Sequence, residues 1–97
     1  MFTRVFTAQI QLDKFSAMRQ VVQDAVIPAA KTQAGFIGLL FLTDAPLGKV
    51  MIVSQWATES DRAASESNGF LREQLAKLSV FVVGPPTTER FVVDCQS

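Results

Sequence analysis

Apolar and polar side chains alternate along residues 2–12, which is the pattern of a half-buried β-strand. One side of this strand would carry Phe2, Phe6, Ala8, Ile10 and Leu12, and the other Thr3, Val5, Thr7, Gln9 and Gln11. Arg4 interrupts the first set, so we expect it to lie near an exposed start of the strand.

A helical spacing follows the first strand. The apolar positions that recur at this spacing are Phe15, Met18, Val22, Ala25 and Ala29, and Asp13 is a candidate N-cap in front of them. Pro28 lies inside the pattern and cannot donate a backbone hydrogen bond to Asp24, so we expect the helix to kink or restart there. Gly35 is a natural stop for the helix.

Two further strands are predicted at 35–43 and 49–56, joined by a turn. The turn Asp44-Ala45-Pro46-Leu47-Gly48 contains the residue types that hairpin connections prefer. In the earlier strand we place Phe36, Leu40 and Leu42 on one face and Ile37, Leu39 and Phe41 on the other. In the later strand, Val50, Ile52 and Trp56 alternate with Met51 and Val53.

The last third of the chain predicts a helix and a strand. Thr58-Glu59-Ser60-Asp61 resembles a capping box with Asp in place of Glu, and the dipeptide Asn68-Gly69 predicts a break within the helix. The apolar face of this helix would hold Ala64, Ser67, Leu71, Leu75 and Leu78. A short β-prone piece at 80–83 ends at Gly84-Pro85-Pro86, and the last strand is expected at 88–95 with Phe91, Val93 and Cys95 facing away from Val92.

The predicted order is β-α-β-β-α-β over a single domain, residues 1–97. With short connections and right-handed crossovers this order gives a ferredoxin-like α+β fold, in which two helices cover one face of a four-stranded antiparallel sheet. The other face should then be polar in a monomer, yet the second, third and fourth strands are apolar on both faces. We therefore expect a homodimer that pairs its sheets face to face; the alternative is that the segment 78–87 covers this face.

Composition narrows the function further. The 97 residues are 48% hydrophobic and 19% charged with a formal net charge of zero, which gives no electrostatic basis for binding nucleic acid or a membrane surface. The absence of His removes the commonest general base and metal ligand, and the single Cys95 allows neither an internal disulfide nor a multi-cysteine metal site. Because no signal peptide or membrane span is recognisable, we expect a cytoplasmic location.

Three groups of residues carry a resemblance to a known family. They are Gly35-Phe36-Ile37-Gly38 with Leu42-Thr43-Asp44, then Gly48-Lys49 with Ser54-Gln55-Trp56-Ala57-Thr58-Glu59, and finally Glu89-Arg90-Phe91-Val92-Val93. This pattern resembles the antibiotic biosynthesis monooxygenase-like family, whose members are dimeric α+β barrels. The resemblance implies cofactor-independent oxidation of a small aromatic or polyketide-like molecule; a non-catalytic small-molecule-binding or structural dimer of the same fold is the alternative.

The resemblance also suggests which residues to inspect. Trp56 matches a Trp that the family places beside its substrate, and Asn68 and Arg72 carry the side-chain types that steady developing oxygen charge. Glu66 lies near the helical place where the haem-degrading branch has a His, so haem ligation through His is impossible here and no cofactor is expected. The candidates for contact with the substrate are Glu66 together with Thr7 and Gln9, which could line a cavity from the first strand.

Each of these candidates also has a purely structural interpretation. Trp56 could be a core residue under the second helix, Asn68 a plain helix break and Arg72 a solvated surface residue. Thr7 and Gln9 could face solvent at the edge of the sheet. Cys95 has no neighbouring base in the pattern and is interpreted as an unreactive thiol rather than a nucleophile. The sequence leaves these alternatives open.

Overall fold

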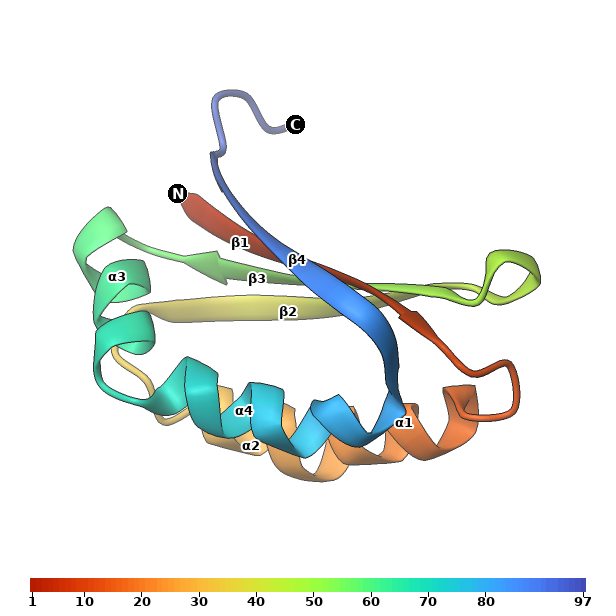
Figure 1. Ribbon diagram of the computed structural model, residues 1–97. Helices are drawn as coiled ribbons and strands as arrows, with labels where there is room; N and C mark the ends of the chain where they lie inside the picture. Colours follow the sequence, from red (N-terminus) through yellow and green to blue (C-terminus); the bar gives the residue numbers. More distant parts are fainter.

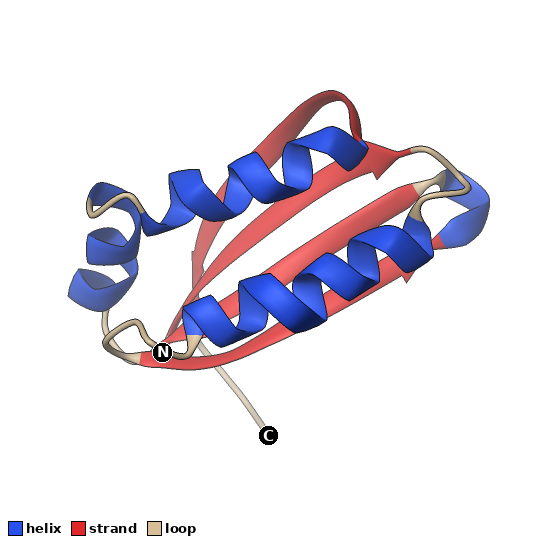
Figure 2. Ribbon diagram, turned by 90° about the horizontal axis from the view of Figure 1, so that it is seen from below, coloured by secondary structure: helices blue, strands red, loops and turns tan.

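The four strands form one antiparallel sheet in the order β2-β3-β1-β4. In the computed structural model, which describes residues 1–97, the strands are β1 (Phe2–Ile10), β2 (Phe36–Asp44), β3 (Lys49–Trp56) and β4 (Val82–Val92). The helices α1, α2 and α4 lie on one side of this sheet, beneath it in Figure 1, and α3 lies at one end of the sheet; Figure 2 shows two long helical rods crossing the covered face. The predicted ferredoxin-like β-α-β-β-α-β fold is confirmed.

The first rod consists of α1 (Phe15–Val21), a π-helical turn at Val22–Val26 and α2 (Ile27–Ala30). The expected irregularity near Pro28 is confirmed as a π-helical turn directly before α2. The chain stays helical through this turn, whose widened backbone lies where the missing amide hydrogen of Pro28 removes a bond. The prediction of Asp13 as N-cap was wrong. Lys14 occupies the N-cap position, and no side chain caps this helix.

The second rod is α4 (Phe70–Leu78). The preceding helix, α3 (Glu59–Ser67), is turned steeply away from it (Figure 2), and the two are separated at Asn68 and Gly69 as predicted. Thr58 is confirmed as the N-cap of α3: its Oγ1 accepts a hydrogen bond of 3.0 Å from the Asp61 amide. The predicted inward face was partly wrong, because Ala64 and Ser67 are exposed. The break at Gly69, where φ is 90°, resets the helical register. The buried positions are Ser65 on α3 and Phe70, Gln74 and Leu78 on α4.

Strand β4 is longer and begins earlier than the sequence suggested. The expected strand at 88–95 was wrong in both bounds, because β4 runs from Val82 to Val92 and passes through Gly84-Pro85-Pro86 instead of ending there. The strand tolerates the prolines because it lies at the edge of the sheet and the β1–β4 register shifts between Thr7 and Gln9. Cys95 lies in the exposed tail beyond β4.

A second irregularity sets the faces of β2. The β2–β3 register shifts between Phe36 and Gly38, so Phe36 packs against Trp56 on the helix side of the sheet. The expected grouping of Phe36 with Leu40 and Leu42 was therefore wrong. Leu39 and Phe41 join the main core between sheet and helices, where the buried side chains are Phe6, Ala8, Ile10, Met18, Val22, Val26, Val50, Ile52 and Leu78.

The sheet face away from the helices is uncovered, as the upper side of the sheet in Figure 1 shows. The pairing places Leu40, Val53 and Val5 in one row across β2, β3 and β1, and Leu42, Met51 and Thr7 in the next. Leu40 is 55% exposed and Leu42 45%. The segment 78–87 forms the end of α4, a 3₁₀ turn and the start of β4, so it does not cover this face. None of the helices is both long and apolar enough to cross a bilayer.

Candidate functional site

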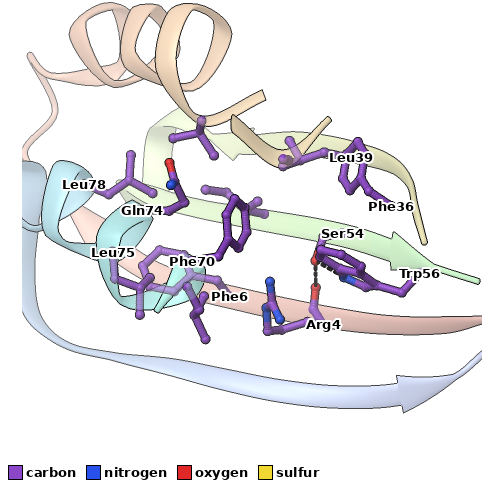
Figure 3. Close-up of a pocket in the computed structure, with 14 residues that line it drawn as sticks. Arg4, Phe6, Phe36, Leu39, Ser54, Trp56, Phe70, Gln74, Leu75 and Leu78 are labelled. Atoms are coloured by element: carbon purple, nitrogen blue, oxygen red, sulfur yellow. Dashed lines mark hydrogen bonds between the residues drawn. The ribbon is translucent and has the colours of Figure 1, made fainter. Parts of the chain in front are cut away.

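A cleft lies between the helix side of the sheet and the helices α2 and α4 (Figure 3). Its cavity volume is about 40 Å³. The cleft is therefore narrow, and a ligand of several rings would have to part the walls. Eleven of its 14 lining residues are hydrophobic: Phe6, Val26, Ala30, Phe36, Leu39, Ile52, Trp56, Phe70, Leu71, Leu75 and Leu78.

Trp56 closes one end of the cleft and is fully buried. It is the last residue of β3, and its ring meets Phe36 and Phe70 edge to face, with ring centres 5.6 and 6.4 Å away. The indole Nε1 donates a hydrogen bond of 3.0 Å to Ser54 Oγ. The ring thus contributes an aromatic wall, while its only donor is already used within the protein.

Arg4 supplies the only charged group in the lining of the cleft. The expectation of an exposed Arg4 at the strand start was wrong, because its side chain is 5% exposed and lies on the helix side of β1. Its guanidinium lies 5.3 Å from the centre of the Trp56 ring, within cation–π range. Its Nη1 donates to Ser65 Oγ at 2.8 Å and to Glu66 Oε2 at 3.3 Å.

Glu66 on α3 joins three arginines. Besides Arg4, its Oε2 accepts from Arg62 Nη1 at 2.5 Å, and its Oε1 accepts from Arg90 Nε at 2.9 Å and Nη2 at 2.6 Å. Partial burial alone would raise the pKa of Glu66, but the hydrogen bonds from Arg90 and Arg62 outweigh it and lower the pKa below its ordinary value. Burial lowers the pKa of Arg4, opposed by its contact with Glu66.

The two remaining polar side chains of the lining are Ser54 and Gln74. The only donor of Ser54 is used within the protein: its Oγ donates to the Arg4 carbonyl oxygen at 3.5 Å and accepts from Trp56. Gln74 on α4 is 4% exposed; its Oε1 accepts from Lys77 Nζ at 3.1 Å, and its Nε2 donates to no protein group. The lining contains no Asp, Glu, His, Tyr or Cys.

Of the three candidates for catalysis, only Trp56 lines the cleft. Asn68 is the C-cap of α3: its Oδ1 accepts from the Phe70 amide at 2.9 Å and its Nδ2 donates to Gln33 Oε1 at 3.0 Å. It borders a shallower hollow that shares Phe70 and Gln74 with the cleft. Arg72 is an exposed residue of α4 and does not line the cleft. The structure therefore does not bring these three side chains together around one cavity.

The three candidates for substrate contact lie outside the lining. Thr7 belongs to the uncovered face, opposite Met51. Gln9 is exposed and lies at the opposite end of β1 from Arg4. When its side-chain amide is oriented so that the nitrogen donates, this nitrogen lies 2.8 Å from the Leu47 carbonyl oxygen. Glu66 reaches the cleft only through Arg4.

Sequence reasoning missed Arg4 and Gln74. The signal for Arg4 was present, since a charged residue stands at a core position of an otherwise regular alternation. A partner carboxylate on α3, 62 residues away, explains how the charge is accommodated there. Gln74 gave no comparable signal, because a Gln on an amphipathic helix is ordinary and the shifted register of α4 determines its burial.

Comparison with known proteins supports the fold. No protein-family model and no curated protein sequence matches the chain. A monooxygenase from Streptomyces coelicolor, solved in complex with nanaomycin D, has a TM-score of 0.74 at 19% identity, with 99% of this chain and 89% of that chain covered. A putative antibiotic biosynthesis monooxygenase from Deinococcus radiodurans has a TM-score of 0.78 at 13% identity, with 100% and 96% covered.

The same fold also occurs in a protein without a stated reaction. An uncharacterized NIPSNAP domain protein from Burkholderia xenovorans has a TM-score of 0.70 at 16% identity, and each chain is covered completely. The predicted resemblance to antibiotic biosynthesis monooxygenases is thus confirmed as a likeness of fold. At these identities the residues of the cleft must carry any argument about chemistry.

Proposed function

We propose that the protein is a cofactor-independent monooxygenase-like enzyme that binds a small aromatic or polyketide-like molecule in the cleft. The observation that carries this proposal is the lining itself, in which Phe6, Phe36, Trp56 and Phe70 combine with aliphatic side chains between sheet and helices. Such a lining buries a flat apolar ring favourably and keeps water from it. The solved complex of the Streptomyces protein with nanaomycin D supports this ligand class.

The proposed reaction takes its electrons from the substrate. In an anthrone, the ring methylene becomes a carbonyl: one atom of O₂ forms the new C=O bond, and the other leaves as water with the two methylene hydrogens. The substrate supplies all four electrons that reduce O₂, so the equation balances without another reductant. The protein would contribute a dry cavity and a fixed orientation of the ring.

The roles of the residues follow from their contacts. Trp56 would hold one edge of the ligand by packing, because its N–H is committed to Ser54. Asn68 stays a candidate for contact with a part of the ligand that protrudes into the neighbouring hollow, which it borders together with Gln74. Arg72, exposed on α4, stays a candidate only for a ligand that extends beyond the cleft.

A binding function without catalysis is the second candidate. It is favoured by one observation: the cleft offers no side chain that would remove a proton from carbon near neutral pH. In this case the substrate's own acidity would have to generate the oxidisable anion, or the protein would only hold the molecule. Binding and turnover must therefore be measured separately.

The test combines oxygen uptake with fluorescence of the only tryptophan. We expect uptake above buffer with an anthrone, reduced in Trp56→Phe and abolished by Leu71→Trp, which would fill the cleft from α4. Arg19→Met is the control variant: it removes a charge on the exposed side of α1, outside the cleft, and is purified and assayed in the same way. Ligand-dependent quenching of Trp56 without uptake across a panel of oxidisable phenols would favour the binding function. The absence of both quenching and oxygen uptake would refute the enzymatic function and the binding function alike.

The uncovered sheet face leads to a proposal about assembly. Leu40, Val53 and Val5 form an apolar row across β2, β3 and β1, which continues on β4 to Glu89. Phe91, 52% exposed on β4, lies on the same face in the neighbouring row, opposite Thr3. We propose that a second copy of the chain covers this face, giving the homodimer expected from the sequence, because soluble monomers rarely expose such a surface. A stable dimer would bury about 800 Å² on each subunit.

The location in the cytoplasm stays a prediction.

A further inference from the structure

Arg4 has hydrogen-bonding capacity that the protein does not use. Its guanidinium carries five N–H groups, yet only Nη1 has protein acceptors, Ser65 Oγ and Glu66 Oε2. The Nε and Nη2 groups donate to no protein atom, although the side chain is 95% buried. Arg4 lines the cleft, so a ligand held there could reach these two donors.

The surroundings of Arg4 leave its positive charge only partly neutralised. Glu66 is the single carboxylate in the cluster, and it is shared among Arg4, Arg62 and Arg90. Three positive charges and one negative charge leave a net charge of +2. No acidic side chain lines the cleft to oppose this excess. Because the cleft is apolar and narrow, an anion placed there would feel the charge with little screening from water.

Gln74 provides a second unused donor, across the cleft from the sheet. Its Oε1 is bound to Lys77, so Nε2 is the end of the amide left for a ligand. Figure 3 shows Gln74 on α4 and Arg4 on β1 bordering the same cavity, with Phe70 between them. The free hydrogen-bond donors of the lining thus belong to Arg4 and Gln74. An acceptor, and above all a charged one, is the complementary group.

We propose that the natural ligand is an aromatic molecule with an anionic oxygen, a carboxylate or an ionised phenol, and that Arg4 binds this oxygen while the ring occupies the apolar part of the cleft. Glu66 and Ser65 act as positioning residues: by engaging Nη1 they fix the guanidinium so that Nε and Nη2 face the cleft. The inference shares the cleft with the proposed function but concerns recognition alone and requires no turnover.

Matched ligand pairs separate charge from shape. At mildly alkaline pH, 2-naphthoate and 2-naphthamide test a carboxylate, and 4-nitrophenolate and 4-nitroanisole test a phenolate, with affinities measured by titration calorimetry. A charge-assisted hydrogen bond predicts that at least one anion binds about 10- to 100-fold more tightly than its neutral partner. Equal affinities within both pairs, or no binding by any of the four ligands, would overturn the proposal.

Variants identify the group responsible. Arg4→Met should remove the preference for the anion while leaving the affinity for the neutral ligand within about twofold, which also shows that the cleft is intact. Arg4→Lys should keep part of the preference, because the charge remains. Arg19→Met also removes one positive charge, but on the exposed side of α1, and should retain the full preference for the anion. A preference that persists in Arg4→Met would refute the assignment.

The two proposals can fail independently. An anion preference that depends on Arg4, without oxygen uptake, would contradict catalysis and support recognition of the anionic oxygen by Arg4. Oxygen uptake together with equal affinity for charged and neutral ligands would leave the proposed reaction standing and remove Arg4 from the recognition of the ligand.

Discussion

The guanidinium of Arg4 lies 5.3 Å from the centre of the Trp56 ring, and both side chains are inside the fold. They come from the neighbouring strands β1 and β3, where Arg4 pairs with Ser54 and Phe2 with Trp56. The same guanidinium bonds Ser65 and Glu66 on α3. One charged side chain thus joins two strands and a helix at the end of the sheet that borders the cleft.

Replacing this arginine should therefore destabilise the fold. Arg4→Met keeps apolar volume but removes the cation–π contact and the hydrogen bond to Ser65, so we expect a loss of about 2 kcal/mol in the free energy of unfolding. Glu66 retains Arg62 and Arg90, which prevents the larger loss that follows when a buried charge loses its only partner. Urea unfolding measures the change. Arg19→Met, on the surface, should stay within about 0.5 kcal/mol, and an equal loss there would contradict the argument.

Glu66 should make stability depend on pH in the acid range. Because its pKa is lower in the folded protein, the unfolded chain binds more protons, and stability rises with pH. The contribution is present above pH 4.5, the ordinary pKa of a Glu, and is lost as the pH falls through the folded pKa. Glu66→Gln removes it. The difference in unfolding free energy between wild type and Glu66→Gln should shrink below pH 4.5; a constant difference would show that Glu66 gains nothing from its arginines.

Gly35 and Gly69 form a natural comparison. Both have positive φ, 74° and 90°, so a Cβ strains either backbone by about 1–2 kcal/mol. At Gly69 a Cβ meets nothing within 4 Å, whereas at Gly35 it would lie 2.1 Å from Asp61 Oδ2, which Thr58 Oγ1 contacts. Gly35→Ala should cost about 3 kcal/mol in unfolding free energy and Gly69→Ala about half of that. Similar losses in urea unfolding would mean that Asp61 moves aside freely.

The proposed dimer predicts a selective effect of charge on the uncovered face. Leu40→Glu places a carboxylate among apolar side chains of the partner, so we expect the particle mass in light scattering to fall from that of two chains to that of one. Val80→Glu is the matched control, because Val80 is 78% exposed in the turn after α4, on the helix side. A wild-type protein that is monomeric at micromolar concentration would refute the dimer.

The regular parts of the fold could be predicted because local chemistry determines them. The alternation in β1 and β3, the hairpin residues 44–48, the cap at Thr58 and the break at Asn68-Gly69 each act over a few residues. The errors arose where a register changes. The shift at Phe36 and Gly38 moved Phe36 to the other face, and the shift opposite Thr7 and Gln9 let β4 continue through Pro85 and Pro86.

The site was less predictable because it depends on contacts between distant residues. Trp56 was found because the chain resembles a family that places a Trp beside its substrate at this position. Arg4 was missed because its burial depends on Glu66 and Ser65, more than 60 positions away. Asn68 and Arg72 were chosen for their side-chain types, which do not indicate where a side chain lies: Asn68 is the C-cap of α3, and Arg72 is exposed on α4.

The proline pair in β4 has a consequence for the behaviour of the chain at high concentration. Prolines 85 and 86 lie on an outer strand and carry no amide hydrogen, so this stretch cannot template the backbone of another molecule. At the opposite margin β2 is uninterrupted, with no proline among its nine residues. Side-by-side polymerisation into fibrils is therefore blocked along one border of the sheet, and its growth would have to start at the other.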